Sequence, residues 1–144
     1  MTTPAPGISV DAHSFNWLVG RFAYDTAGVV GAVAVSSDGL LIAMSPGMER
    51  DTADRLAAIS SAMLSLAQGV SETYPLGRPD RVVIELTEGY MLVTTISAGC
   101  SLGALASTEA SLGTIAYEMA VFANRANEVL TPRLIEELKH TVGY

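Results

Sequence analysis

The residue types that most often do chemistry are few in this 144-residue chain, and their spacing pairs none of them. His13 and His140 lie at opposite ends, each in a predicted terminal helix, and nothing in the sequence pairs either with a serine or with the single cysteine. A histidine acts as a general base only when such a partner lies within hydrogen-bond reach. Cys100 opens a predicted strand, where a lone thiol usually packs as a small hydrophobe. We therefore expect no catalytic residue and interpret the protein as a non-enzyme.

The acidic residues predict neither a metal site nor an acid–base pair. Asp38-Gly39 stands between two apolar runs, and this dipeptide is a strong signal for a hairpin turn, which explains it without a ligand. Glu85 falls on a predicted strand and Glu88 in the turn after it, with no other polar residue converging on them. The sequence contains no H-E-x-x-H motif, no paired cysteines and no glycine-rich phosphate loop. We expect neither a cofactor nor a metal.

Composition excludes several classes of partner. The chain is 49% hydrophobic and 16% charged, with a net charge of −7 and a single lysine, Lys139, so it lacks the basic patch of a binder of nucleic acid or anionic membrane. No apolar run approaches the ~18–20 residues of a membrane-spanning helix, and the first residues do not resemble a secretion signal. We expect a cytoplasmic protein, which only a partner would bring to a membrane. The excess apolar surface is expected at a subunit interface.

Residues 49–70 predict one long helix with two stripes at steps of three and four residues. The large apolar stripe is expected to pack on the helix's own sheet: Leu56, Ile59, Met63, Leu66 and Val70. The small stripe would let another backbone approach closely, and we expect it to contact a partner: Ala53, Ala57, Ser60, Leu64 and Ala67. The alternative is that these alanines and serines face water, because alanine is a strong helix former.

The other patterns predict the element order α-ββ-α-βββ-α. Residues 1–10 contain two prolines and no periodicity, which indicates a disordered tail. The expected elements are a helix from residue 11, a hairpin over 28–45, the helix 49–70, strands over 81–87, 90–97 and 100–107, a helix over 112–130 and a short helix within 131–144. They predict one α+β domain over 11–130, a three-layer α/β/α sandwich around a five-stranded antiparallel sheet.

Four segments, in their order and their residues, resemble the Roadblock family of dynein-light-chain-like proteins. They are VVGAVAVSSDGLLIA, ADRLAAISSAMLSLAQG, VIELTEGYMLVTTI and SLGTIAYEMA. More narrowly, the chain resembles the short single-domain form found in actinobacteria, which is encoded with a sensor-kinase-like protein and a small Ras-like GTPase. The resemblance covers about residues 15–130. It departs at Thr26-Ala27-Gly28-Val29, where Pro-Gly is expected.

The resemblance implies a profilin- or longin-like fold and a homodimer whose two sheets join edge to edge. The joining edge would be the strand over 81–87, with Arg81, Val83 and Glu85 at the contact. The long helices would lie side by side across the twofold axis and touch through the small-residue stripe. Such pairing would also cover an otherwise open, apolar edge strand.

The resemblance further implies a non-catalytic regulator that binds a small Ras-like GTPase through the paired helices. The positions expected to contact it are Arg50, Asp51, Asp54, Arg55, Ser61 and Ser65. Arg50 or Arg55 could reach a phosphate as an arginine finger, or could simply be an arginine on a solvated helix start. Two alternatives stay open: a nucleotide-independent adaptor for a sensor-kinase-like or other partner, and an enzyme or small-ligand binder. The last would need an apolar pocket with converging polar groups.

Overall fold

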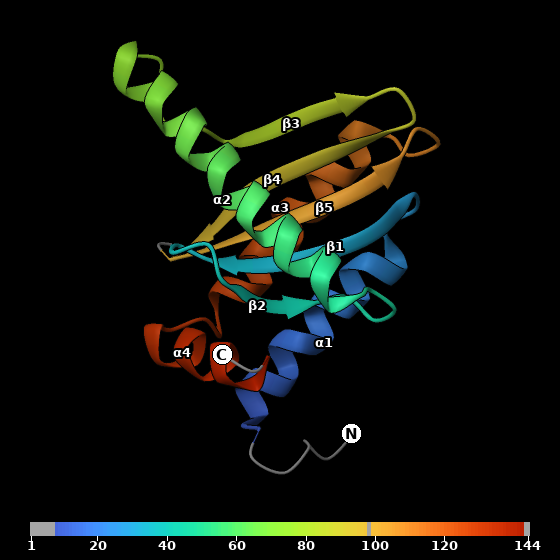
Figure 1. Cartoon of the computed structure of the whole chain (residues 1–144), viewed down its shortest axis with the longest axis vertical. Coiled ribbons are helices and arrows are strands. Elements are labelled where there is room, and N and C mark those ends of the chain that lie inside the picture. Colours follow the sequence, from blue (N-terminus) through green and yellow to red (C-terminus); the bar gives the residue numbers. More distant parts are fainter. Residues whose placement is uncertain (1–7, 98, 143–144) are drawn as a thin grey trace.

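The computed structural model describes residues 8–97 and 99–142, which form four helices and five strands (Figure 1). In chain order these are α1 (Val10–Asp25), β1 (Val29–Ser36), β2 (Leu41–Met44), α2 (Arg50–Thr73), β3 (Arg81–Leu86), β4 (Gly89–Ser97), β5 (Cys100–Ser107), α3 (Leu112–Asn127) and α4 (Pro132–Thr141). The predicted order of elements is confirmed. Most of the tail predicted over 1–10 lies outside the described residues, and Val10 already belongs to α1.

All five strands form one antiparallel sheet in the order β2-β1-β5-β4-β3. β1 and β2 form a hairpin, and β3, β4 and β5 form a meander whose last strand pairs with β1. β3 therefore lies at one edge, and among the described strands it pairs only with β4 (Figure 1). The five-stranded antiparallel sheet is confirmed, and the strand expected over 81–87 is an edge strand.

The turn of the first hairpin differs in type from the one that Asp38-Gly39 predicts. Gly39 has a φ of 83°, but Asp38 does not have a positive φ, so the turn is not the two-residue type I′. The Gly39 N–H donates to the Ser36 carbonyl and the Ser36 N–H donates to the Leu40 carbonyl, both at 2.9 Å. The loop thus has three residues, with glycine in the left-handed position.

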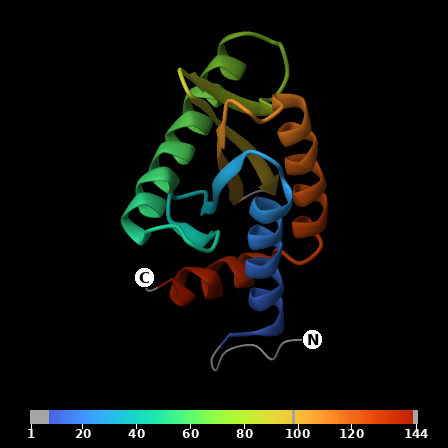
Figure 2. The same cartoon turned by 90° about the vertical axis from the view of Figure 1, so that its right-hand side faces the viewer.

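The helices lie on both faces of the sheet and complete three layers (Figure 2). α2 alone covers one face, whereas α1 and α3 lie side by side on the other (Figure 2). The core on the α1 and α3 side contains Phe15, Phe22 and Phe122. The Phe122 ring packs edge-to-face on the other two, with centroids 6.1 Å from Phe15 and 5.9 Å from Phe22. The three-layer sandwich is confirmed.

α4 packs into the same core, at the end of α1 and beside β2 (Figure 1). Its side chains Leu134, Ile135 and Leu138 are buried. The Thr131 hydroxyl caps the helix by accepting the Leu134 N–H at 3.0 Å, and Pro132 occupies the first helical position. The C-terminal helix is therefore bonded and packed as part of the domain.

α2 packs on the sheet through its small residues, which reverses the predicted orientation. Ala53, Ala57 and Ser60 are all 0% exposed, and the two alanines pack on the buried side chains of β1 and β2. The prediction that these three residues contact a partner is therefore wrong. In the large stripe, Met63 is buried, but Leu66 and Val70 are exposed.

Gly103 on β5 supplies the physical reason for this orientation. A β-carbon at Gly103 would lie 2.4 Å from the Ser60 Oγ, so the backbones of α2 and β5 approach too closely for large side chains between them. Helical periodicity identifies both stripes of α2 but does not show which one faces the sheet. Gly103 was the residue in the sequence that could have indicated which stripe faces the sheet. It does so only once β5 is known to lie beneath α2.

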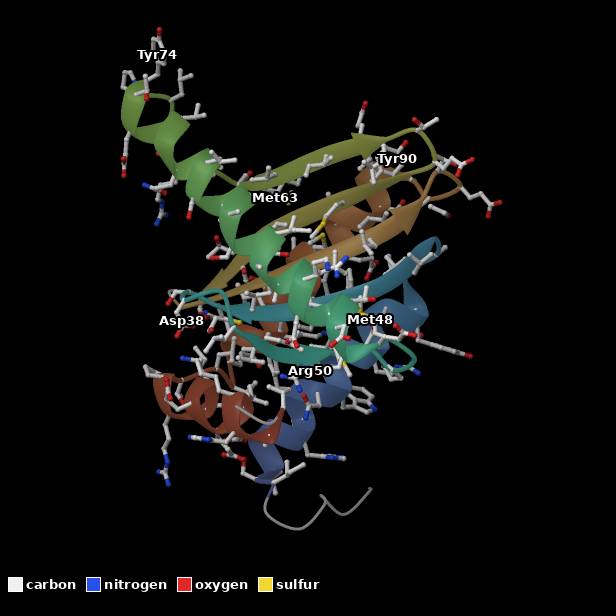
Figure 3. The ribbon with its side chains drawn as sticks, in the orientation of Figure 1. Asp38, Met48, Arg50, Met63, Tyr74 and Tyr90 are labelled. Atoms are coloured by element: carbon white, nitrogen blue, oxygen red, sulfur yellow. The ribbon has the colours of Figure 1, made fainter. Side chains whose placement is uncertain are left out.

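α2 is also longer than predicted. It continues through Gly69 to Thr73, whereas the sequence pattern ends at residue 70. Its last turns extend beyond β3, and Tyr74 stands at the far end of the helix (Figures 1 and 3). The C-terminal half of α2 is therefore only partly supported by its own sheet.

Candidate functional site

The residues that could do chemistry do not form a reactive centre in the described parts of the chain. Cys100 is buried at the start of β5, and burial raises the pKa of its thiol to about 12, so it is protonated and a poor nucleophile at neutral pH. Glu85 and Glu88 are both exposed. Within residues 8–97 and 99–142, no group of three or more His, Cys, Asp or Glu side chains is placed to hold a metal ion.

A groove of about 530 Å³ lies between the C-terminal half of α2 and the edge strand β3. Its apolar wall comes from α2, from the loop after it and from β3: Met63, Leu66, Val70, Leu76, Val82 and Ile84. Leu66 is 75% exposed and Leu76 is 82% exposed. We refer to this feature as the α2–β3 groove.

Exposed apolar side chains continue from the α2–β3 groove onto its borders. Tyr74 is exposed after α2 and Leu86 is exposed on β3, next to Val83, which lines the groove and is also exposed. The outer side of β3 has no strand beside it within the described chain, so its backbone N–H and C=O groups face outward along the sheet edge. A contiguous apolar surface next to an unpaired strand edge is typical of a protein–protein interface.

The residues expected at the dimer interface lie in different places. Ala67, Arg81 and Val83 line the α2–β3 groove, and Glu85 is exposed on the same strand. Leu64 lies on the opposite flank of α2, where it is partly buried against the sheet. The edge strand and one residue of the small stripe thus border the groove, while the buried residues of that stripe do not.

The N-terminal end of α2 carries the charged residues expected to contact a partner. Arg55 and Asp51 are exposed, whereas Arg50 is held by Asp54 and by the end of α4. The Arg50 Nε donates to both carboxylate oxygens of Asp54, at 3.0 and 3.1 Å, and its Nη1 donates to the Val142 carbonyl after α4. Arg55 is therefore better placed than Arg50 to meet another molecule.

A second polar contact ties α4 to the first hairpin. The Lys139 Nζ lies 3.0 Å from the Asp38 carboxylate and 3.0 Å from that of Glu136. The hydrogen bond from the Ser36 hydroxyl, followed by that from Lys139, holds the pKa of Asp38 below its usual value. Hydrogen bonds to Glu136 and Asp38 raise the pKa of Lys139. The hairpin turn is thus fixed from two sides.

Ser61 and Ser65, the last two predicted contact positions, border a cleft on the other flank of α2 from the α2–β3 groove. The cleft has a volume of about 420 Å³ and lies over the ends of β1, β4 and β5. Most of its lining side chains carry hydroxyl groups, and we refer to it as the hydroxyl cleft. No sequence pattern predicts this cleft, because four separate segments contribute its lining.

The sheet with α2 on one face and α1 and α3 on the other defines a profilin-like α/β domain. Profilin from Schizosaccharomyces pombe superposes with a TM-score of 0.61 at 14% identity, covering 81% of this chain and 99% of that chain. The chain belongs to the Roadblock/LC7 domain family, whose model matches residues 15–120. The resemblance stated from the sequence segments is confirmed.

Two bacterial structures show the same family fold. A Roadblock/LC7 domain from Streptomyces avermitilis is 30% identical to this chain and superposes with a TM-score of 0.75. The superposition covers 78% of this chain and 94% of that chain. MglB from Myxococcus xanthus is 14% identical and is similar in fold, with a TM-score of 0.73 over 81% of this chain and 94% of that chain.

No curated protein matches the chain. Among the described helices, none has the length and apolar content needed to cross a membrane.

Proposed function

We propose that this protein is a homodimeric regulatory module in which the α2–β3 groove of each subunit is covered by the other. The observation that carries the proposal is the continuous exposed apolar surface of the groove and its borders, which adjoins the unpaired edge of β3. Two β3 strands related by a twofold axis would pair with each other, and the two copies of α2 would then lie next to each other. A self-complementary surface of this kind is what an isologous dimer requires.

Family membership supports both the self-association and the regulatory role. The chain is a Roadblock/LC7 domain, and one solved MglB structure, 17% identical to this chain, is described as having a tetrameric arrangement. The family resemblance assigns such modules to small Ras-like GTPases. On this chain the partner surface would be the exposed start of α2, with Asp51 and Arg55 as its outward charges and Arg50, Asp54, Ser61 and Ser65 beside them.

The experiment is a pull-down from a lysate of the source organism, run in parallel with a GTP analogue and with GDP, with captured proteins identified by mass spectrometry. Capture of a small GTPase that depends on the nucleotide is the expected result. Arg55→Glu should weaken this capture at least tenfold, because it reverses an outward charge at the partner surface. Arg125→Glu is the matched control. Arg125 lies on α3, on the other side of the sheet, so this variant should capture the GTPase as well as the unaltered protein does.

Two outcomes would replace the proposal. Equal capture of a different protein with both nucleotides would favour the nucleotide-independent adaptor, with a sensor-kinase-like protein as the first candidate. Unchanged GTPase capture by Arg55→Glu would remove the start of α2 as the partner surface. Light scattering after size exclusion must show that both variants keep the mass of the unaltered protein, so that loss of capture is not loss of the dimer.

A further inference from the structure

The hydroxyl cleft is a second concave surface on α2, and the proposed homodimer leaves it open. It lies on the opposite flank of the helix from the α2–β3 groove, and its sheet residues come from the ends of β1 and β4 and the start of β5. The side chains from α2 recur at helical spacing on one flank: Ser61, Ser65, Gln68 and Glu72. The same turns of α2 therefore present an apolar wall on one side and a hydrogen-bonding wall on the other.

The sheet forms the floor of the cleft. Val35, Ser101 and Thr95 are directly opposite one another on β1, β5 and β4. Side chains opposite each other on adjacent strands share one face of a sheet, and Val35 packs under α2. The hydroxyls of Ser101 and Thr95 thus lie on the α2 side of the sheet, where both residues line the cleft.

The Ser101 hydroxyl is the strongest indication of a ligand site. Ser101 is only 5% exposed, yet its hydroxyl makes no hydrogen bond to any residue that the structure describes. Ser36, which also lines the cleft, differs because its hydroxyl donates to the Asp38 carboxylate, with the Leu40 carbonyl as a second acceptor within reach of the same hydrogen. The only side-chain oxygen that is fully buried without a partner among the described residues is the Ser60 Oγ, so the Ser101 oxygen is open to the cleft, where its one donor and two acceptor sites are available to water or to a ligand. A molecule in the cleft would fill them.

Charge and size restrict the class of that molecule. Glu72 is the only charged side chain among the described lining residues, so the cleft offers no cation to bind a phosphate or a carboxylate. Serine and threonine hydroxyls both donate and accept hydrogen bonds, which matches ligands that carry hydroxyl groups themselves. The volume of about 420 Å³ falls within the range of about 300–1,000 Å³ typical of small-molecule sites.

We propose that the hydroxyl cleft binds a neutral, polyhydroxylated small molecule about the size of a monosaccharide. The hydroxyls of Ser65 and Ser101 and the amide of Gln68 would bond its hydroxyl groups from two sides. Leu64 and Gly99 would contact its carbon face. The site adjoins the proposed GTPase surface, because Ser61 and Ser65 belong to both, but it is separate from the proposed dimer contact, since the α2–β3 groove lies on the other flank of the helix.

Binding is tested by titrating the ¹⁵N-labelled protein with myo-inositol and, separately, with glucose, while recording amide shifts. The expected result is a saturable shift at the amides of Ser65, Gln68, Gly99 and Ser101 with at least one of the two probes. The amide of Ile84 in the α2–β3 groove should not shift. Inorganic phosphate at the same concentration should leave all of these amides unchanged.

Two variants separate the site from general surface effects. Ser101→Ala removes the hydroxyl at the floor of the cleft and should raise the Kd of the probe about tenfold. Ser65→Leu fills the cleft and should abolish the shifts. Ala62→Leu adds the same side chain at an exposed position of α2 outside the cleft, so it should bind the probe normally. Ser65→Leu also keeps the test informative if the Ser101 variant fails to fold, because position 65 is exposed.

The proposal would be overturned by several results. One is the absence of any saturable shift with either probe up to about 50 mM, a concentration at which even a weak site would be partly filled. Another is a shift spread evenly over the surface, or one that survives in Ser65→Leu. A response to phosphate at the cleft amides would contradict the neutral class of ligand.

Discussion

On one flank of α2, Leu66 and Val70 face the edge strand β3, and on the other flank Ser65 and Gln68 face the ends of β1, β4 and β5. The α2–β3 groove has a volume of about 530 Å³, and the hydroxyl cleft has a similar volume of about 420 Å³. Exposed apolar carbon is stabilised by covering it with protein, whereas hydroxyl groups are satisfied by water or by a small polar ligand. The flanks therefore differ in what can occupy them.

The sheet beneath α2 explains why both flanks are open. Because Ala53, Ala57 and Ser60 bring the helix down onto β1 and β5, the larger side chains and the hydroxyls are left on its two sides. The residues that fix the helix on its sheet thus decide which surfaces remain for partners. A small-residue stripe need not mark a subunit interface, since it can serve close packing within one chain.

Placing a charge in the apolar flank should have the largest effect. Leu66→Glu is expected to raise the dimer Kd at least 100-fold, because the interface would bury an unpaired carboxylate. The variant should stay folded, since Leu66 is exposed in the single chain. Light scattering after size exclusion gives the mass, and circular dichroism checks the fold.

Tyr117→Glu is the matched control, because Tyr117 is also an exposed apolar residue but lies on α3, on the other side of the sheet. It should keep the mass of the unaltered protein. If both variants dissociate, or if neither does, the α2–β3 groove is not the contact surface.

Adding a methyl group beneath α2 should have an intermediate effect. Gly103→Ala places a β-carbon 2.4 Å from the Ser60 Oγ and should lower the free energy of unfolding by about 1–3 kcal/mol. Ser60→Ala removes a buried hydroxyl that has no partner among the described residues, and should leave stability unchanged or raise it slightly. Urea unfolding measures both.

The double variant is the decisive comparison. Ser60→Ala removes the contact at 2.4 Å, and the next neighbours of the new methyl group are the Val33 Cγ2 at 3.3 Å and the β-carbon of residue 60 at 3.5 Å. The double variant should therefore regain most of the stability lost in Gly103→Ala. If the two effects simply add, the contact between α2 and β5 is not the one described.

The smallest effect is expected at the hairpin that borders the hydroxyl cleft. Asp38→Asn should lower the free energy of unfolding at pH 7 by only a few tenths of a kcal/mol, because Asp38 is about half exposed and solvent screens its pair with Lys139. The pKa of Asp38 is lowered in the folded state, so its contribution is present above the usual value of 3.8 and is lost as the pH falls below it. Urea unfolding of both proteins at pH 7 and near pH 3 should show the difference shrinking at the lower pH. A constant difference would mean that the charge is not involved.

Several features of the fold could be predicted because local sequence determines them. Helical periodicity gave α2 and α3, the alternating apolar runs gave the strands, and Thr131-Pro132 marked the start of α4. The order of these elements, with β3 at an edge, is what the Roadblock resemblance implies. The single elements need only the residues of one segment at a time, whereas the position of β3 at an edge was inferred from the resemblance of four segments together.

The remaining features depend on contacts between distant segments. The rotation of α2 depends on Gly103, which lies 43 positions after Ser60 in the chain. The contact of Arg50 with the Val142 carbonyl spans 92 positions, and no local pattern indicates it. The hydroxyl cleft draws on β1, α2, β4 and β5, so its side chains converge only in the folded sheet. Sequence patterns predicted the elements but not the sides that they present to one another.

The mass of the unaltered protein by sedimentation equilibrium tests the central proposal most directly. If the α2–β3 groove is closed by a second copy, the protein should sediment at twice the chain mass of 15.0 kDa from about 1 to 100 µM. A mass of one chain across that whole range would contradict the homodimer and would leave the groove for a different protein.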